Sequence, residues 1–154
     1  MLDKTQFYYE SEPVGIKIEK GKITLINFWK AEDGFSRGLM DYSQLLIDRN
    51  PQWKINLDII CLLFAGVPKL EKKEEKNYRK KMIDLIISRK WLNAKHYFIS
   101  QDAENYLQSK YDLTTTSYPF YLIVGTDQKI KHYGSPMQAK IENKIEALIK
   151  QNVN

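Results

Sequence analysis

The feature that most constrains the fold is an apolar run in the middle of the chain. Residues 57–64 read Leu-Asp-Ile-Ile-Cys-Leu-Leu-Phe, almost without a polar side chain. A strand that is apolar on both faces is typical of the interior of a mostly parallel sheet, because helices cover both sides of such a sheet. Parallel strands need a crossover between them. Residues 69–89 can supply it, since their apolar side chains recur at the helical spacing of three and four.

Segments before this run extend the pattern of strand, helix and strand. Residues 14–19 and 23–29 read as two short strands with a turn between them. Asp33 is a good N-cap for a helix over residues 34–49, which ends before the next proline. Gly38 lies inside that helix, where glycine costs about 1 kcal/mol relative to alanine. Its presence predicts close packing at that point.

Four further segments follow the central run. Residues 96–100 predict a short strand and residues 102–110 a short helix. Residues 119–124 and 129–133 predict an antiparallel hairpin across a turn of four residues. Residues 137–150 predict a closing helix with one apolar face.

Together these segments predict a single α/β domain, with residues 1–13 as an extended N-terminal segment. A chain of 154 residues buries roughly 70% of its unfolded surface, which is enough for a core without a disulfide. We expect a central mixed sheet flanked by helices. Its strands are expected near residues 22–29, 57–64, 119–124 and 129–133, and its helices near residues 34–49, 69–89 and 137–150.

The segment that joins the strand at 23–29 to the following helix has a recognisable pattern. It resembles the active-site segment of the TlpA/ResA-like branch of the thioredoxin superfamily, whose members carry Asn-Phe-Trp-Ala-x-Trp-Cys-x-x-Cys-Arg. Here the pattern aligns with Asn27, Phe28, Trp29, Lys30, Ala31, Glu32, Asp33, Gly34, Phe35, Ser36 and Arg37. Asp33 and Ser36 therefore stand where the resemblance places the two cysteines.

The second half of the chain extends the resemblance. Residues 111–113 stand in the places of the family's Tyr-Gly-Val, and residues 127–130 match its usual Asp-Gly-Lys-Ile hairpin. Residues 117–124 resemble the stretch with the family's cis-proline, which implies a cis bond between Tyr118 and Pro119. The resemblance implies a thioredoxin-like fold, in which the backbone of Tyr118 would hydrogen-bond an extended peptide.

The altered site excludes thiol chemistry and leaves two kinds of role open. Thiol-disulfide exchange needs an attacking thiolate and a resolving thiol, which Asp33 and Ser36 cannot provide. Asp33 is either a helix cap or an electrostatic recognition point for a partner. Pro119 either shapes its loop or supports peptide docking. The candidate binding surface consists of Trp29, Glu32, Asp33, Phe35, Ser36, Tyr118 and Pro119.

No other motif indicates catalysis or a bound cofactor. Cys61 is the only cysteine and lies in the most apolar strand, which predicts a buried hydrophobic side chain. His96 and His132 fall on different strands and lack a second cysteine, so neither a zinc site nor a catalytic triad is expected. The two glycines at 34 and 38 lack the lysine of a phosphate-binding loop. We expect no catalytic residue, no metal and no cofactor.

The distribution of charge bears on possible partners. Net charge is +5, and much of the basic excess lies between residues 69 and 95. Glutamates are interleaved with these lysines, which favours a solvated helix face over a patch for nucleic acid or anionic lipid. The longest near-continuous apolar run, residues 59–67, is much shorter than the roughly 20 residues of a membrane-spanning helix. Residues 1–12 contain no apolar signal segment.

We therefore expect a redox-inactive thioredoxin-like domain that binds a protein or an extended peptide through the former active-site surface. Two alternatives stay open. The chain could act in a thiol-disulfide redox pathway through the cysteines of a partner, or it could be a structural subunit of a larger assembly. We expect no nucleic-acid partner and no membrane span. The cellular compartment and the oligomeric state stay open, although the family that the chain resembles is often extracytoplasmic in bacteria.

Overall fold

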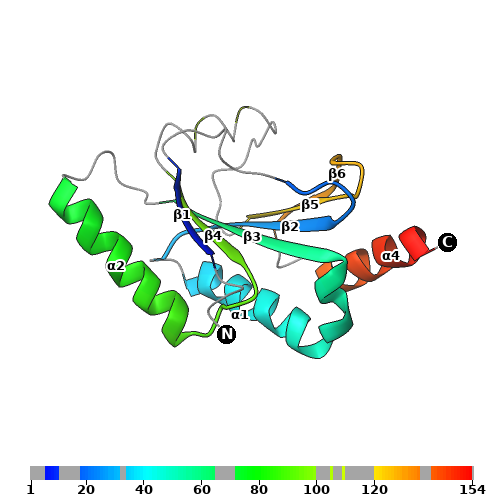
Figure 1. Ribbon diagram of the computed structural model, residues 1–154, viewed down its shortest axis with the longest axis horizontal. Coiled ribbons are helices and arrows are strands. Elements are labelled where there is room, and N and C mark those ends of the chain that lie inside the picture. Colours follow the sequence, from blue (N-terminus) through cyan, green and yellow to red (C-terminus); the bar gives the residue numbers. More distant parts are fainter. Residues whose placement is uncertain are drawn as a thin grey trace.

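Six strands form one mixed sheet in the computed structural model, which describes residues 6–10, 18–31, 34–64, 72–99, 105, 109, 120–135 and 140–153. They are β1 (Gln6–Glu10), β2 (Ile23–Trp29), β3 (Leu57–Phe64), β4 (Lys95–Ile99), β5 (Phe120–Val124) and β6 (Ile130–Gly134). Their order across the sheet is β1-β4-β3-β2-β5-β6, as Figure 1 shows. The first four strands in that order pair in parallel, and β5 pairs antiparallel with both β2 and β6.

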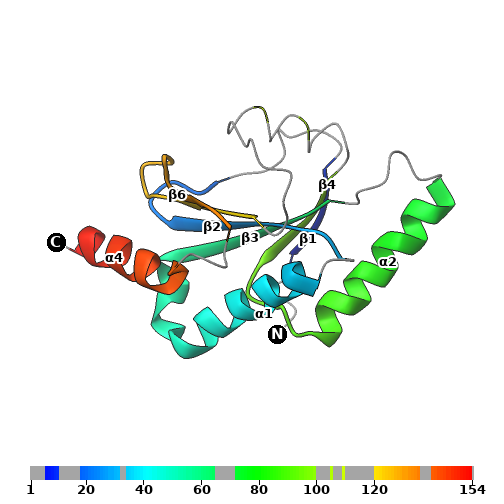
Figure 2. The same cartoon turned by 180° about the vertical axis from the view of Figure 1, so that it is seen from behind.

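The helices that cover this sheet are α1 (Gly34–Arg49), α2 (Lys72–Ser88) and α4 (Ile141–Val153), with a short 3₁₀ helix η3 (Pro51–Ile55) after α1. In both Figure 1 and Figure 2, α1, α2 and α4 lie on the same side of the sheet. None of the helices in the described part of the chain has the length and apolar character needed to cross a membrane.

Apolar side chains pack on both faces of the sheet, as the sequence of β3 predicts. One cluster joins alternate residues of β2, β3 and β5 to the buried sides of the three helices, with Leu39, Ile86 and Ile145 among its members. The other cluster lies on the opposite face and includes Phe28, Leu62 and Leu122. The two clusters explain why β2, β3 and β5 have few polar residues, because consecutive side chains of a strand point to opposite faces.

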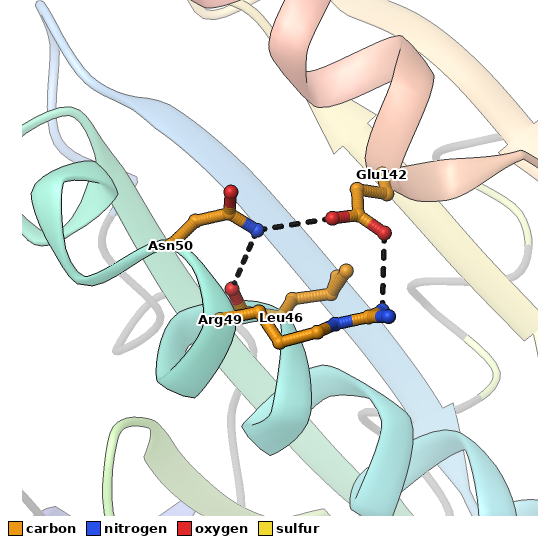
Figure 3. Close-up of polar contacts among 4 residues, drawn as sticks. All are labelled: Leu46, Arg49, Asn50 and Glu142. Carbon is orange, nitrogen blue, oxygen red and sulfur yellow. Dashed lines mark hydrogen bonds and ion pairs between the residues drawn. The ribbon is translucent and has the colours of Figure 1, made fainter.

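Helix α4 is tied to the end of α1 by polar contacts, which Figure 3 shows in close-up. The Arg49 guanidinium donates a hydrogen bond to Glu142 Oε2 at 3.0 Å. The Asn50 amide donates to Glu142 Oε1 at 3.1 Å and to the carbonyl oxygen of Leu46 at 3.0 Å. One carboxylate at the start of α4 thus binds both groups at the end of α1.

The predicted elements are confirmed for β2, α1 and β3, and shifted by a few residues for α2, β4, β5 and β6. Helix α4 begins at Ile141 rather than at residue 137 and continues to Val153. Ile18 and Glu19 are not in a strand, and residues 14–17 lie outside the described residues. Of the predicted helix at 102–110, Asn105 and Ser109 are helical and the other residues lie outside the description.

Two findings differ from what the sequence predicts. Residues 6–10, expected as part of an extended segment, form an edge strand that pairs in parallel with β4. The prediction of close packing at Gly38 is wrong, because a Cβ atom at that position would meet no atom within 4 Å. Gly38 lies on the exposed side of α1. Glycine in a helix signals low propensity, and sequence alone does not say which face of the helix it occupies.

Candidate binding surface at the start of helix α1

Two side chains in the first turn of α1 contact the backbone that follows β2. The backbone N–H of Lys30 donates a hydrogen bond to Ser36 Oγ at 3.2 Å. The Arg37 Nε–H donates to the carbonyl oxygen of Ala31 at 2.7 Å. Both contacts tie the end of β2 to the first turn of α1. Glu32 and Asp33 lie outside the described residues, so the proposed capping role of Asp33 stays a prediction.

Ser36, the third residue of α1, is buried. Its hydroxyl oxygen accepts the Lys30 N–H and thereby stabilises the turn. This serine stands where the resemblance places the second thiol. Its described contact is structural, because a hydroxyl that accepts a backbone hydrogen bond orients the chain without needing to react.

The two aromatic residues of the predicted surface have opposite environments. Trp29 is fully buried, and its ring meets Trp91 edge to face with centroids 5.4 Å apart and planes at 83°. Phe35, by contrast, is 65% exposed. Trp29 therefore supports the surface from below, whereas Phe35 belongs to the surface itself.

The beginning of β5 lies next to the end of β2. Phe120, the first residue of β5, pairs with Phe28, and the two rings are 6.0 Å apart in an edge arrangement. The fold thus brings the start of β5 to the end of the sheet where α1 begins. Tyr118 and Pro119 precede β5 but lie outside the described residues, so their predicted cis bond stays a prediction.

Cys61 lies in the centre of β3 with its thiol buried, as the sequence predicts. Burial raises the pKa of this thiol from 9.0 to about 12, although a hydrogen bond from the Asn27 amide acts in the opposite direction. The Asn27 nitrogen lies 3.8 Å from Cys61 Sγ and 2.7 Å from Ser43 Oγ. The thiolate that disulfide exchange requires is therefore scarce at neutral pH.

A row of polar side chains crosses the buried sheet at this level. Cys61 pairs in register with Asn27 on β2 and with His96 on β4. His96 is buried, and its Nε2 lies 2.8 Å from the carbonyl oxygen of Trp91. Burial lowers the pKa of His96 from 6.5 to about 4. The sequence shows these residue types but not the row, because the register between parallel strands depends on the tertiary structure.

His132 lies apart from this row, on β6, as the sequence predicts for the two histidines. No cluster of three or more metal-ligating side chains exists among the residues that the structure describes. The described part of the candidate surface therefore consists of Phe35 above a turn held by Ser36 and supported by Trp29. Its remaining predicted members are Glu32, Asp33, Tyr118 and Pro119.

No protein-family model matches the chain, and a search of curated proteins found no significant match. Several solved structures, however, are similar to the structure of this chain. A thiol:disulfide interchange protein from Bacteroides sp. has 17% identity and a TM-score of 0.59, over 84% of this chain and 74% of that one. The thioredoxin domain of a thiol-disulfide oxidoreductase from Bacteroides vulgatus has 17% identity and a TM-score of 0.58, over 88% and 81%.

An exposed lipoprotein thioredoxin from Streptococcus pneumoniae is a third similar structure, with 13% identity and a TM-score of 0.56 over 86% of each chain. At these identities the similarity establishes the fold. The chain has the thioredoxin-like fold, a mixed sheet flanked by helices, and its structural neighbours include thiol-disulfide oxidoreductases. Unlike an enzyme that cycles a dithiol within one chain, this chain has a single cysteine.

Proposed function

We propose that this chain is a redox-inactive thioredoxin-like domain that binds a protein or an extended peptide through the surface at the start of α1. The observation that supports this proposal most strongly is Phe35. A phenylalanine that is 65% exposed leaves apolar area in water, which a partner could bury at a gain of about 25 cal/mol per Å². Aromatic anchors of this kind dominate the energetics of many interfaces.

The surroundings of Phe35 favour binding over redox chemistry. The one thiol of the chain is buried in β3 with a raised pKa, and the Ser36 hydroxyl is engaged by the backbone of Lys30. The end of β2 is therefore hydrogen-bonded to the first turn of α1, which carries the exposed Phe35. Such contacts lower the entropy cost of binding, because less of the surface must become ordered.

An extended peptide is the favoured ligand because the start of β5 lies beside the end of β2. A segment that enters a sheet at this point can present backbone groups to a strand-like peptide. In this proposal Tyr118, the residue before Pro119, supplies those backbone groups, and Glu32 and Asp33 supply negative charge at the rim. Trp29 holds the turn in place from below through its contact with Trp91.

The redox half of the proposal is tested by insulin reduction with dithiothreitol as the electron source. We expect the wild-type rate to equal the protein-free rate, because one buried thiol cannot cycle a dithiol. The Asp33→Cys/Ser36→Cys double variant serves as the positive control, and we expect it to gain weak activity. A wild-type rate above background that persists in Cys61→Ser would overturn the proposal.

The binding half is tested with peptides selected from a displayed library on the wild-type chain. We expect Phe35→Ala to weaken the selected peptides at least tenfold, which corresponds to about 1.4 kcal/mol, in calorimetric titrations. Ile55→Ala is the matched control, because Ile55 is an equally apolar side chain that is 76% exposed on η3. If the two variants lose the same amount of peptide affinity, the selected peptides bind exposed apolar side chains in general and not this surface.

A further inference from the structure

Helix α1 carries an apolar stripe that is exposed at both of its ends. Phe35, Gly38, Tyr42 and Leu45 follow one another at intervals of three, four and three residues, so they lie along one side of the helix. Phe35 is 65% exposed and Leu45 is 46% exposed, whereas Tyr42 is partly buried against the core. This heptad spacing is the pattern with which one helix packs against another.

The stripe has an open space at Gly38. A Cβ atom at this position would meet no atom within 4 Å, and Gly38 is exposed in the middle of the described helix. Its φ is not positive, so neither the packing nor the backbone of α1 requires glycine. Glycine is unfavourable inside a helix, but it allows another molecule to approach the backbone closely.

The next position along the stripe is already bound by α4. Arg49, four residues after Leu45, donates a hydrogen bond to Glu142 at 3.0 Å, as Figure 3 shows. The exposed part of the stripe therefore ends at Leu45. Asp41 lies beside the stripe, and its carboxylate is 3.6 Å from the Arg89 guanidinium. The negative charge next to the stripe is thus compensated within the chain.

The stripe is complementary to itself when two copies of α1 lie antiparallel and meet at the level of Met40. Phe35 lies five residues before Met40 and Leu45 five residues after it, so these two side chains face each other across the pair. Gly38 and Tyr42 lie two residues before and after Met40, so the Tyr42 ring of the second copy faces the open space at Gly38. A two-fold axis repeats both contacts, as a symmetric dimer requires.

We propose that this stripe joins two copies of the chain through an antiparallel pair of α1 helices. The inference rests on the proposed function, because it names a second copy as a protein partner of the surface that contains Phe35. Residues 35–45 span about three turns of helix, and so short an interface forms a reversible dimer rather than an obligate one. A peptide that binds Phe35 therefore competes with the second copy.

The test is sedimentation velocity of the full chain over a range of concentrations. We expect a dimer fraction that rises with concentration in the wild type. Leu45→Lys should weaken dimerisation at least tenfold, because it places a charge in the interface. Gly38→Leu should also weaken it at least tenfold, although it adds apolar surface, because the new side chain fills the space for Tyr42. Thermal denaturation of each variant shows whether it is folded.

Ile55→Lys is the matched control, because Ile55 is 76% exposed on η3 and lies outside the stripe. We expect it to dimerise as the wild type does. The proposal is overturned if the wild type stays monomeric at every concentration, if Ile55→Lys and Leu45→Lys weaken the dimer equally, or if Gly38→Leu strengthens it.

Peptide binding by Leu45→Lys separates this inference from the proposed peptide surface. Leu45 lies about 15 Å along the helix axis from Phe35, so we expect this variant to bind the selected peptides with at least the wild-type affinity. A wild type that binds peptides and never dimerises overturns the dimer alone. A dimer that dissociates in Leu45→Lys, from a chain that binds no peptide, supports the dimer and overturns the extended peptide as the ligand.

Discussion

At the scale of the single residue, His96 is a buried side chain whose protonation changes the free energy of unfolding. Its ring lies in the row with Asn27 and Cys61, and its Nε2 contacts the carbonyl oxygen of Trp91 at 2.8 Å. The neutral tautomer with a proton on Nε2 satisfies that carbonyl. Desolvation disfavours the charged ring, which lowers the pKa of His96 from 6.5 to about 4.

This pKa predicts a loss of stability in mild acid. Between pH 6.5 and about 4 the unfolded chain binds a proton at His96 that the folded chain does not. The free energy of unfolding therefore falls as the pH falls through this window, by roughly 3 kcal/mol at its lower end, since each pKa unit is worth about 1.4 kcal/mol. Urea denaturation at several pH values measures this fall.

The matching variant is His96→Gln, whose amide can still donate to the Trp91 carbonyl but does not titrate. We expect its free energy of unfolding to depend less on pH than that of the wild type. His132→Gln provides a comparison at a partly exposed site on β6. If His96→Gln keeps the full wild-type slope between pH 4 and 6.5, other groups cause the acid sensitivity.

At the scale of the element, α1 contains a glycine that nothing in the described structure requires. A Cβ at Gly38 would meet open space, and the residue does not have a positive φ. Gly38→Ala should therefore raise the free energy of unfolding by up to about 1 kcal/mol, the difference in helix propensity between the two residues. Thermal or urea denaturation measures the change.

Gly21→Ala is the control for this prediction. Gly21 has a φ of +91°, which alanine adopts only with strain, so the same substitution should lower stability there. A destabilised Gly38→Ala would mean that the exposed side of α1 needs close access to its backbone. Such a result would also draw attention to a partner at the start of this helix, next to Phe35.

At the scale of the whole molecule, two hydrogen bonds join α1 to the segment between α2 and β4, one from Trp91 to Asp41 and one from the Asn93 backbone to Gln44. The Trp91 Nε1–H donates to Asp41 Oδ1 at 2.7 Å, and Arg89 lies 3.6 Å from the other carboxylate oxygen. Trp91 itself is buried against Trp29. The contact therefore connects Trp91, at the base of the candidate surface, to α1 across 50 positions of sequence.

Asp41→Ala should lower the free energy of unfolding by about 1–3 kcal/mol, because it leaves a buried indole N–H without its acceptor. Asp41→Asn should cost less, since its amide oxygen can still accept. Asp48→Ala on the same helix removes an exposed carboxylate that accepts a hydrogen bond from Gln44 at 3.3 Å, and a change within about 0.5 kcal/mol is expected. Equal effects of the two alanine variants in urea denaturation would contradict this role for Asp41.

Local patterns in the sequence were sufficient for most of the elements and for the fold class. The apolar run at 57–64 predicts β3, and the helical spacing after Asp33 predicts α1 up to Arg49. These patterns depend on neighbouring residues, so they can be interpreted without knowing the partners of each element. The edge strand β1 escaped this reasoning, although three of its five residues are aromatic and strands favour aromatic residues. A run of five residues is too short for its pattern to show that it pairs with β4, which is distant in sequence.

The tertiary structure alone decided which residues are available at the candidate surface. Trp29 and Phe35 are both aromatic and six residues apart, yet the first is buried and the second is exposed. The contact of Lys144 with Tyr121 also exists only in the folded chain, because the two residues are 23 positions apart in sequence. Burial and strand register depend on pairing between distant segments, and periodicity within one segment contains no information about that pairing. The sequence by itself thus determined most of the elements and the fold class, whereas only the folded chain determined which residues are buried and which are exposed at the candidate surface.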